Sequence, residues 1–220
     1  MYNVPDRRVN GAWIKSYIEV IDGKKYRCTT RSGKLWAGIG SRVSDKFKAE
    51  NPTYSGKHNL FKDFQHFAEW CQEQYGYLNK TDNGRFWHLD KDLLIENSSY
   101  GPETCIFVPE YINTLFVRPR MEQKYLLGVT RRNPGKGMKS EYTKPFVIRG
   151  FCREEQKDVT FYFESEIEAH KKWQDCKVAK IDFLLSTRYD ISNHTQLILA
   201  LETTKMSIQD DIDNHRISKR

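Results

Sequence analysis

The alternation of apolar and polar positions near the amino terminus predicts a β-hairpin. Residues 17–30 hold two short runs of apolar and β-branched side chains, and Asp22-Gly23 stands between them. An Asp-Gly pair suits the positive φ angles of a tight hairpin turn. After the hairpin, residues 35–47 carry an apolar side chain at every fourth position, which predicts a helix, although Gly38 and Gly40 lower the helical propensity.

The clearest helical pattern lies in residues 60–76. Apolar side chains recur there at spacings of three and four, at Leu60, Phe61, Phe64, Phe67, Ala68 and Cys71. Gly76 suits the end of such a helix, since glycine accepts the backbone conformation found there. His66 lies one position off the apolar stripe, so we expect its side chain to be at the surface.

In the second half of the chain, three candidate strands precede a long helix. The strands are predicted at residues 125–130, 146–152 and 159–163, and the helix at residues 165–185. Ser165, followed by Glu168, is typical of a capping box that starts a helix. A shorter helix is predicted at residues 196–201, and the polar residues 205–220 are expected to form a mobile tail. The pattern predicts an α+β protein with a three-stranded antiparallel sheet packed by one helix.

The net charge of +7 and the pI near 9.1 favour an acidic partner, most often nucleic acid. The excess positive charge is concentrated in one segment of the chain. Between residues 118 and 149, nine cations stand against Glu122 and Glu141, which leaves +7: Arg118, Arg120, Lys124, Arg131, Arg132, Lys136, Lys139, Lys144 and Arg149. We interpret these residues as a nucleic-acid-binding segment that contacts phosphates. A solvated loop is the alternative.

Cysteine usage and hydropathy bear on location. The five cysteines are scattered and contain no Cys-x-x-Cys pair, which indicates a reducing compartment. No apolar run approaches the roughly 20 residues that span a bilayer. We therefore expect a soluble protein in the cytoplasm, or in the host cytoplasm if a phage encodes it, without membrane association.

The stretch from Trp87 to Asn113 concentrates side chains that can do chemistry. It holds an imidazole, carboxylates and amides, at His88, Asp90, Asp92, Asn97 and Asn113. Such groups bind and activate water at a hard metal ion. The stretch is thus a candidate active site.

Several blocks of the chain together resemble a known family. The blocks are the aromatic helix NLFKDFQHFAEWCQEQYGY, then WHLDKDLL, then YGPETCIFVPEYIN, and the strand-strand-strand-helix pattern that runs to Trp173. They look like the phage-borne HNH homing endonucleases that carry an AP2-like DNA-binding module, over roughly residues 35–200. The resemblance implies an HNH-like ββα unit with flanking helices in residues 1–117, and an AP2-like three-stranded sheet packed by a helix in residues 118–204.

The resemblance also implies roles for individual residues. His88 would be the general base that activates water, and Asn113 would be a ligand of one Mg²⁺ or Mn²⁺ ion at the scissile phosphate. The family has a metal-binding residue directly before this histidine, where this chain has Trp87. Asp90 is expected to supply the missing carboxylate, since positions 88 and 90 of a strand point to the same face. Alternatively, Asp90-Lys91-Asp92 is a turn with a lysine-neutralised charge pair.

Three functions stay open at the level of the sequence. The first is a metal-dependent endonuclease that cuts double-stranded DNA with His88, Asp90 and Asn113. The second is a DNA-binding relative that no longer cleaves. The third is a phage protein that binds a host protein through a reused surface. The oligomeric state does not follow from the sequence.

Overall fold

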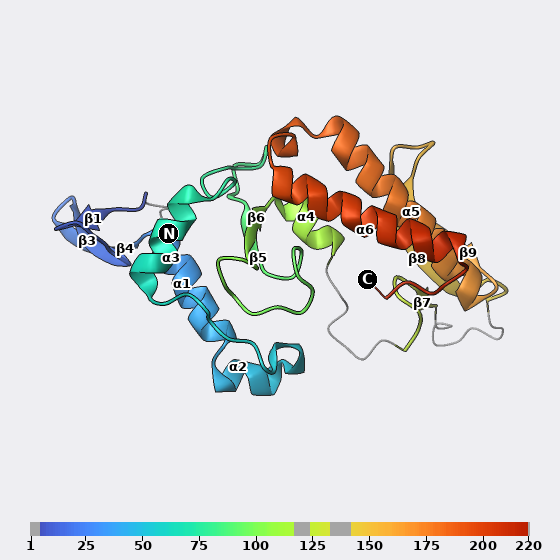
Figure 1. Cartoon of the computed structure of the whole chain (residues 1–220), viewed down its shortest axis with the longest axis horizontal. Helices are drawn as coiled ribbons and strands as arrows, with labels where there is room; N and C mark the ends of the chain where they lie inside the picture. Colours follow the sequence, from blue (N-terminus) through green and yellow to red (C-terminus); the bar gives the residue numbers. More distant parts are fainter. Residues whose placement is uncertain (1–4, 117–123, 133–141, 220) are drawn as a thin grey trace. The chain divides into compact units, whose positions relative to one another are not determined.

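The computed structural model describes residues 5–116, 124–132 and 142–219. The chain divides into two compact units, Met1–Leu115 and Phe116–Arg220 (Figure 1). Both units mix helices with small antiparallel sheets, which confirms the predicted α+β class. Within the described residues, no helix has the length and apolar character needed to cross a bilayer.

The first unit contains three two-stranded sheets and four α-helices among its described residues. Its elements are β1 (Arg8–Val9), β2 (Ala12–Trp13), β3 (Ser16–Ile21), β4 (Lys24–Thr29), α1 (Arg31–Arg42), α2 (Asp45–Glu50), the 3₁₀ turn η1 (Pro52–Tyr54), α3 (Phe64–Glu73), β5 (His88–Asp90), β6 (Ile106–Val108) and α4 (Glu110–Leu115). The predicted hairpin is confirmed as β3–β4, with Asp22 at φ 50° and Gly23 at φ 74° in its turn.

The helix predicted at residues 35–47 is wrong in its bounds. α1 starts earlier, because the Thr30 side chain accepts the Gly33 N–H at 3.1 Å and caps the helix. It ends before Ser44, whose side chain accepts the Phe47 N–H and starts α2. The apolar stripe thus continues over two short helices, whose starts are set by the capping residues Thr30 and Ser44.

The helix predicted at residues 60–76 is confirmed in type, as α3, and shorter in extent. Asp63 caps its start by accepting the His66 N–H at 2.9 Å. The buried face of α3 packs on α1, where the Trp36 ring lies 6.1 Å from the Phe64 ring. His66 is exposed, as expected.

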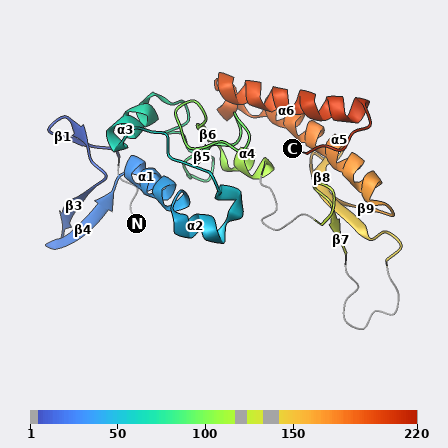
Figure 2. The same ribbon diagram turned by 60° about the horizontal axis from the view of Figure 1, so that its bottom comes forward.

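The second unit is a three-stranded antiparallel sheet with two long helices. Its elements are β7 (Thr130–Arg131), β8 (Phe146–Cys152), β9 (Lys157–Phe163), α5 (Glu166–Thr187), the 3₁₀ turn η2 (Tyr189–Ile191) and α6 (Thr195–Asp213), and the strand order is β7-β8-β9. In Figure 2, α5 lies between the sheet and α6. Ile148 of β8 and Cys176 of α5 belong to the core between them.

The structure confirms one prediction for this unit and contradicts two. The long helix is confirmed, and Ser165 caps it by accepting the Glu168 N–H at 3.2 Å. The strand predicted at residues 125–130 is wrong, since only residues 130–131 pair with β8. Residues 205–213, expected in a mobile tail, instead form the second half of α6, because Thr204 and Ile208 are buried.

Candidate functional site

The β5–β6–α4 unit brings His88 and Asn113 together. β5 pairs with β6 in antiparallel register, with His88 opposite Val108. All of β6 is buried, so the hairpin is anchored in the core. The Pro109 carbonyl then accepts the N–H groups of Ile112 and Asn113, at 3.0 and 3.1 Å, and so opens the first turn of α4. This turn carries the Asn113 amide back to β5.

The Asn113 side chain contacts the imidazole of His88. Their Nδ2 and Nδ1 atoms lie 3.4 Å apart, and both residues are half-buried. When the amide N–H donates to Nδ1, the proton of the neutral ring is on Nε2. A contact of 3.4 Å is longer than a typical N–H hydrogen bond, so a water molecule can take the place of the amide at Nδ1. The lone pair of His88 Nδ1 thus accepts either the Asn113 amide or a water molecule that replaces it.

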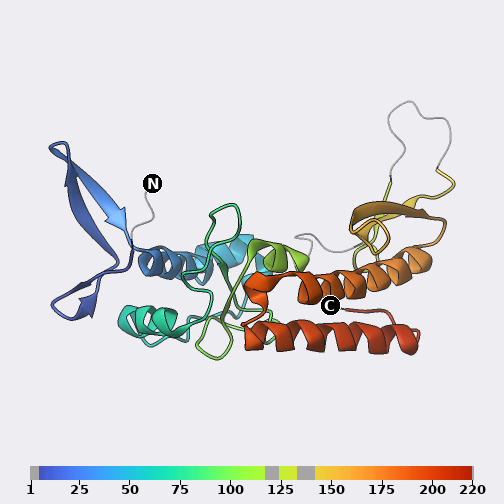
Figure 3. The same ribbon diagram turned by 90° about the horizontal axis from the view of Figure 1, so that it is seen from above.

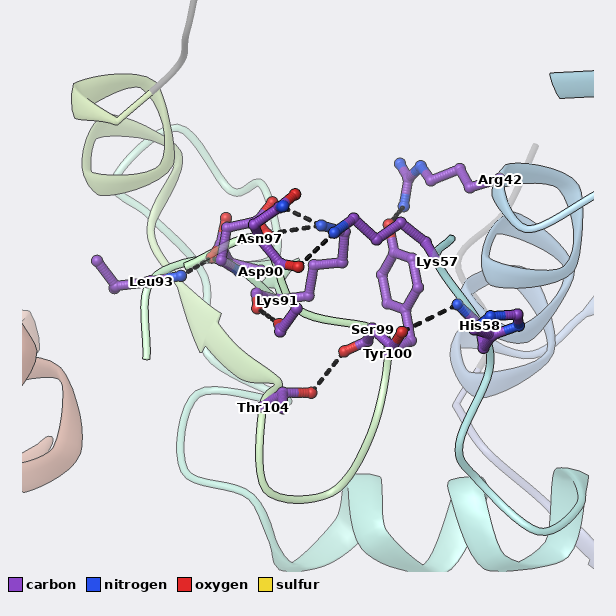
Figure 4. A network of polar contacts seen from close by, with 12 residues as sticks. Arg42, Lys57, His58, Asp90, Lys91, Leu93, Asn97, Ser99, Tyr100 and Thr104 are labelled. Carbon is purple, nitrogen blue, oxygen red and sulfur yellow. Dashed lines mark hydrogen bonds and ion pairs between the residues drawn. The ribbon is translucent and has the colours of Figure 1, made fainter. Parts of the chain in front are cut away.

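Asp90 stabilises the turn that follows β5. Its Oδ1 accepts the N–H groups of Asp92 at 2.9 Å and Leu93 at 2.7 Å, and these bonds close the turn after β5 (Figure 4). Burial raises the pKa of Asp90, against the two backbone hydrogen bonds, which lower it. In the described part of the chain, no hydrogen bond joins Asp90 to His88 or Asn113.

The loop after β5 is held by two buried lysines. Lys91 is 6 % exposed, and its ammonium lies 2.6 and 2.7 Å from the two Asp92 oxygens. Lys57 is also 6 % exposed and donates to the backbone carbonyl of Asn97 (Figure 4). Of the two readings of Asp90-Lys91-Asp92, the structure shows the turn with a lysine-neutralised charge pair. The polar side chains of this loop therefore serve its conformation.

Trp87 is a core residue. It is 1 % exposed, its N–H donates to the Asn79 carbonyl, and its own carbonyl accepts the Arg31 guanidinium at 2.7 Å. The indole ring packs on Gly76, whose φ is +87° and where an added Cβ would overlap the ring. The position before His88 thus anchors β5 in the core.

The donor set does not fit a Mg²⁺ or Mn²⁺ ion. These ions prefer several oxygen ligands, carboxylates above all. Among the residues that the structure describes, no group of three or more histidine, cysteine, aspartate or glutamate side chains could hold a metal. His88 and Asn113 offer one imidazole and one amide, and Oδ1 of the Asp90 carboxylate accepts two backbone N–H groups. No catalytic step through a metal follows from this arrangement.

The cations predicted to bind nucleic acid lie in the second unit. Arg118, Arg120, Lys136 and Lys139 fall outside the described residues. Lys124, Arg131, Lys144 and Arg149 are exposed, and Arg132 is half-buried. The guanidinium of Arg132 lies 3.5 Å from the ring centre of Tyr142 and 4.9 Å from that of Tyr162. The rings hold this arginine in place at the sheet.

The sheet has one face free of α5, which we call the open face. Ile148 packs in the core and an added Cβ at Gly150 would overlap Cys176 of α5, so the alternate residues of β8 point the other way. Strand pairing puts the following side chains on the open face: Thr130, Val147, Arg149, Thr160 and Tyr162. The next pair in this register, Phe151 and Asp158, contacts Phe183 and Lys180 of α5 instead. Thr160 and Tyr162 were not among the residues predicted to bind nucleic acid. The period-two pattern of β9 could have found them, because Val159, Phe161 and Phe163 alternate with them.

Comparisons of the chain with protein-family models, curated proteins and solved structures gave no match.

Proposed function

We propose that this protein binds double-stranded DNA and hydrolyses a phosphodiester bond at the β5–β6–α4 unit, as a phage-type HNH-like endonuclease. The contact between His88 and Asn113 carries the proposal. A basic imidazole oriented by a second side chain is the arrangement that general base catalysis needs. The second unit, with its three-stranded sheet backed by α5, would be the AP2-like DNA-binding module.

The proposed reaction uses water as the nucleophile. His88 Nδ1 takes a proton from the water while its oxygen forms a bond to phosphorus. The bond between phosphorus and the departing sugar oxygen breaks, and that oxygen takes a proton from solvent. The Asn113 amide holds the ring of His88 through Nδ1 before the reaction, and the attacking water takes its place there.

DNA binding is supported by the charge and shape of the second unit. Arg132 and Arg149 are the cations at or on the open face. The register also brings one carboxylate, Asp158, to this side of the sheet, but it forms an ion pair with Lys180 of α5 at 3.5 Å. Arginine beside tyrosine can contact phosphate and stack on sugar or base. A sheet face of this kind gives an affinity that falls steeply as salt rises.

A plasmid-nicking assay tests the catalytic part. The wild-type protein, with Mg²⁺ or Mn²⁺ and without either ion, is expected to nick supercoiled plasmid in at least one condition. His88→Ala is expected to lower the nicking rate by about 100-fold or more, since it removes the base. His58→Ala is the control, because His58 is an exposed histidine of the same unit outside the β5–β6–α4 site, and it should keep the wild-type rate. Equal rates for wild type and His88→Ala would refute the proposal.

A second candidate function is DNA binding without cleavage. The buried Trp87 and the turn-closing contacts of Asp90 favour it, because no metal-binding carboxylate then adjoins His88. This function predicts no nicking with either ion, and equal DNA affinity for the wild type and His88→Ala. A salt-independent affinity would argue against both functions.

A further inference from the structure

The β3–β4 ribbon of the first unit extends beyond the helices that follow it (Figure 3). Its outer half exposes large apolar side chains on both faces. Ile18 is 65 %, Val20 is 62 % and Tyr26 is 47 % exposed. A two-stranded ribbon with two solvated faces is marginally stable by itself, and exposed apolar residues grouped in this way mark a contact surface.

The two faces of the ribbon differ in charge. Opposed residues of an antiparallel pair point to the same face. The register therefore puts the following residues on one face: Ser16, Ile18, Val20, Lys25, Arg27 and Thr29. We call it the cationic face, because Lys25 and Arg27 are its only charged residues. Arg27 donates to Ser16 on this face, at 3.3 Å. The other face carries both Glu19 and Lys24, so its charges balance. The Glu19 carboxylate accepts a hydrogen bond from the Cys28 thiol at 3.4 Å.

We infer that the cationic face of the β3–β4 ribbon is a second contact site for duplex DNA. Lys25 and Arg27 of β4 would bind backbone phosphates, while Val20 and Ile18, opposite them on β3, would pack on sugars and base edges. A two-stranded ribbon is narrow enough to enter the major groove, where apolar side chains meet the thymine methyl. The inference rests on the proposed DNA binding, but it uses none of the residues of the open face or of the β5–β6–α4 site.

Pairing with a second copy of the chain fits this surface less well. If two β4 edges joined, the cationic faces of both copies would merge into one sheet face. Lys25 and Arg27 of one copy would then lie beside the same residues of the other. Like charges on neighbouring strands destabilise a sheet. The phosphate backbone of DNA has the complementary charge.

Two adjacent lysines give a matched test in the full-length protein. Lys25 lies on the cationic face and Lys24 on the other, and both are exposed. The affinity for a fluorescently labelled DNA duplex is measured by anisotropy over a series of KCl concentrations. Lys25→Glu is expected to weaken binding by about tenfold more than Lys24→Glu. It should also reduce the slope of log K against log salt by about 0.9, for one lost phosphate contact.

The same experiment separates the possible failures. If the wild type binds duplex DNA and the two variants bind equally, the inference about the ribbon is wrong and the proposed function stands. If the wild type does not bind DNA, both fail. Sedimentation of the same proteins addresses self-association: a wild-type dimer that Lys25→Glu dissociates, with no selective effect on DNA binding, would assign the ribbon to a second copy of the chain and overturn the inference.

Discussion

Gly76 sets the position of the site from a distance along the chain. Its positive φ and its missing side chain let the Trp87 ring lie directly against the backbone. Trp87 directly precedes His88, so the packing of this ring determines where β5 begins. The orientation of the candidate base therefore depends on the contact between Gly76 and Trp87.

Two glycine substitutions measure this dependence. Gly76→Ala is expected to lower the free energy of unfolding by about 3 kcal/mol or more, from backbone strain together with overlap with Trp87. Gly84→Ala is the control, because Gly84 also has a positive φ, at +77°, but no atom lies within 4 Å of the added Cβ. It should cost about 1 kcal/mol, from strain alone. Urea unfolding gives both values, and equal losses would contradict the role of the Trp87 contact.

His170 makes the stability of the second unit depend on pH. It is fully buried, its Nδ1 donates to the Leu127 carbonyl at 2.9 Å, and its Nε2 accepts the Ser218 N–H at 3.1 Å. Burial lowers the pKa of His170, while the bond to Leu127 and the nearby Asp211 and Glu166 raise it. The neutral ring is the one that fits both bonds.

The sign of the pH effect follows from this lowered pKa. The stabilising contribution of neutral His170 is complete above the pKa of the unfolded chain, about 6.5, and is lost as the pH falls through the lower folded pKa. We expect the free energy of unfolding to decrease as the pH falls below about 6.5. A glutamine at position 170 can keep the hydrogen bonds to Leu127 and Ser218 but does not titrate. In His170→Gln, the free energy of unfolding should therefore decrease less as the pH falls. Urea unfolding followed by circular dichroism at each pH checks this, and identical pH profiles would refute it.

At the scale of elements, α6 is the clearest departure from the sequence pattern. The residues from Lys205 onward are mostly polar, but Ile208 is 2 % exposed and lies one turn after the buried Thr204. A sparse apolar stripe is sufficient here because α6 needs to cover only one side of α5.

A pair of substitutions distinguishes a packed helix from a mobile tail. Ile208→Ala is expected to lower the free energy of unfolding by about 2–4 kcal/mol, because it leaves a cavity. Met206→Ala, at a position that is 68 % exposed on the same helix, should change it by less than about 0.5 kcal/mol. Thermal or urea unfolding gives both numbers. If Ile208→Ala were as mild as Met206→Ala, the packing of α6 on α5 would be wrong.

At the scale of the whole molecule, the two compact units should unfold as separate cooperative bodies. Each has its own buried residues, around Phe67 and Phe107 in the first and around Ile148 and Ile181 in the second. Differential scanning calorimetry is expected to resolve two transitions. Gly76→Ala should lower the midpoint of one and Ile208→Ala that of the other. A single transition that both variants shift equally would contradict this.

The features that the sequence by itself determined are local ones. The Asp22-Gly23 turn, the start of α5 at Ser165 and the apolar stripe of α3 all depend on residues within a few positions of each other. Turn conformation and helix capping involve φ angles and hydrogen bonds of this short range, so they can be inferred from a single stretch of chain. The pair of His88 and Asn113 was suggested by the family resemblance, and their side chains lie 3.4 Å apart.

Other features depend on contacts between residues far apart in the sequence, and only the tertiary structure decided them. Trp87 is held by Gly76 and Arg31, and Ser218 is held by His170. Strand alternation alone pointed Asp90 toward the same face as His88, but the turn after β5 offered its carboxylate two backbone N–H groups. A buried carboxylate is stabilised by such donors, so Asp90 closes the turn after β5 instead of facing His88 as a metal ligand.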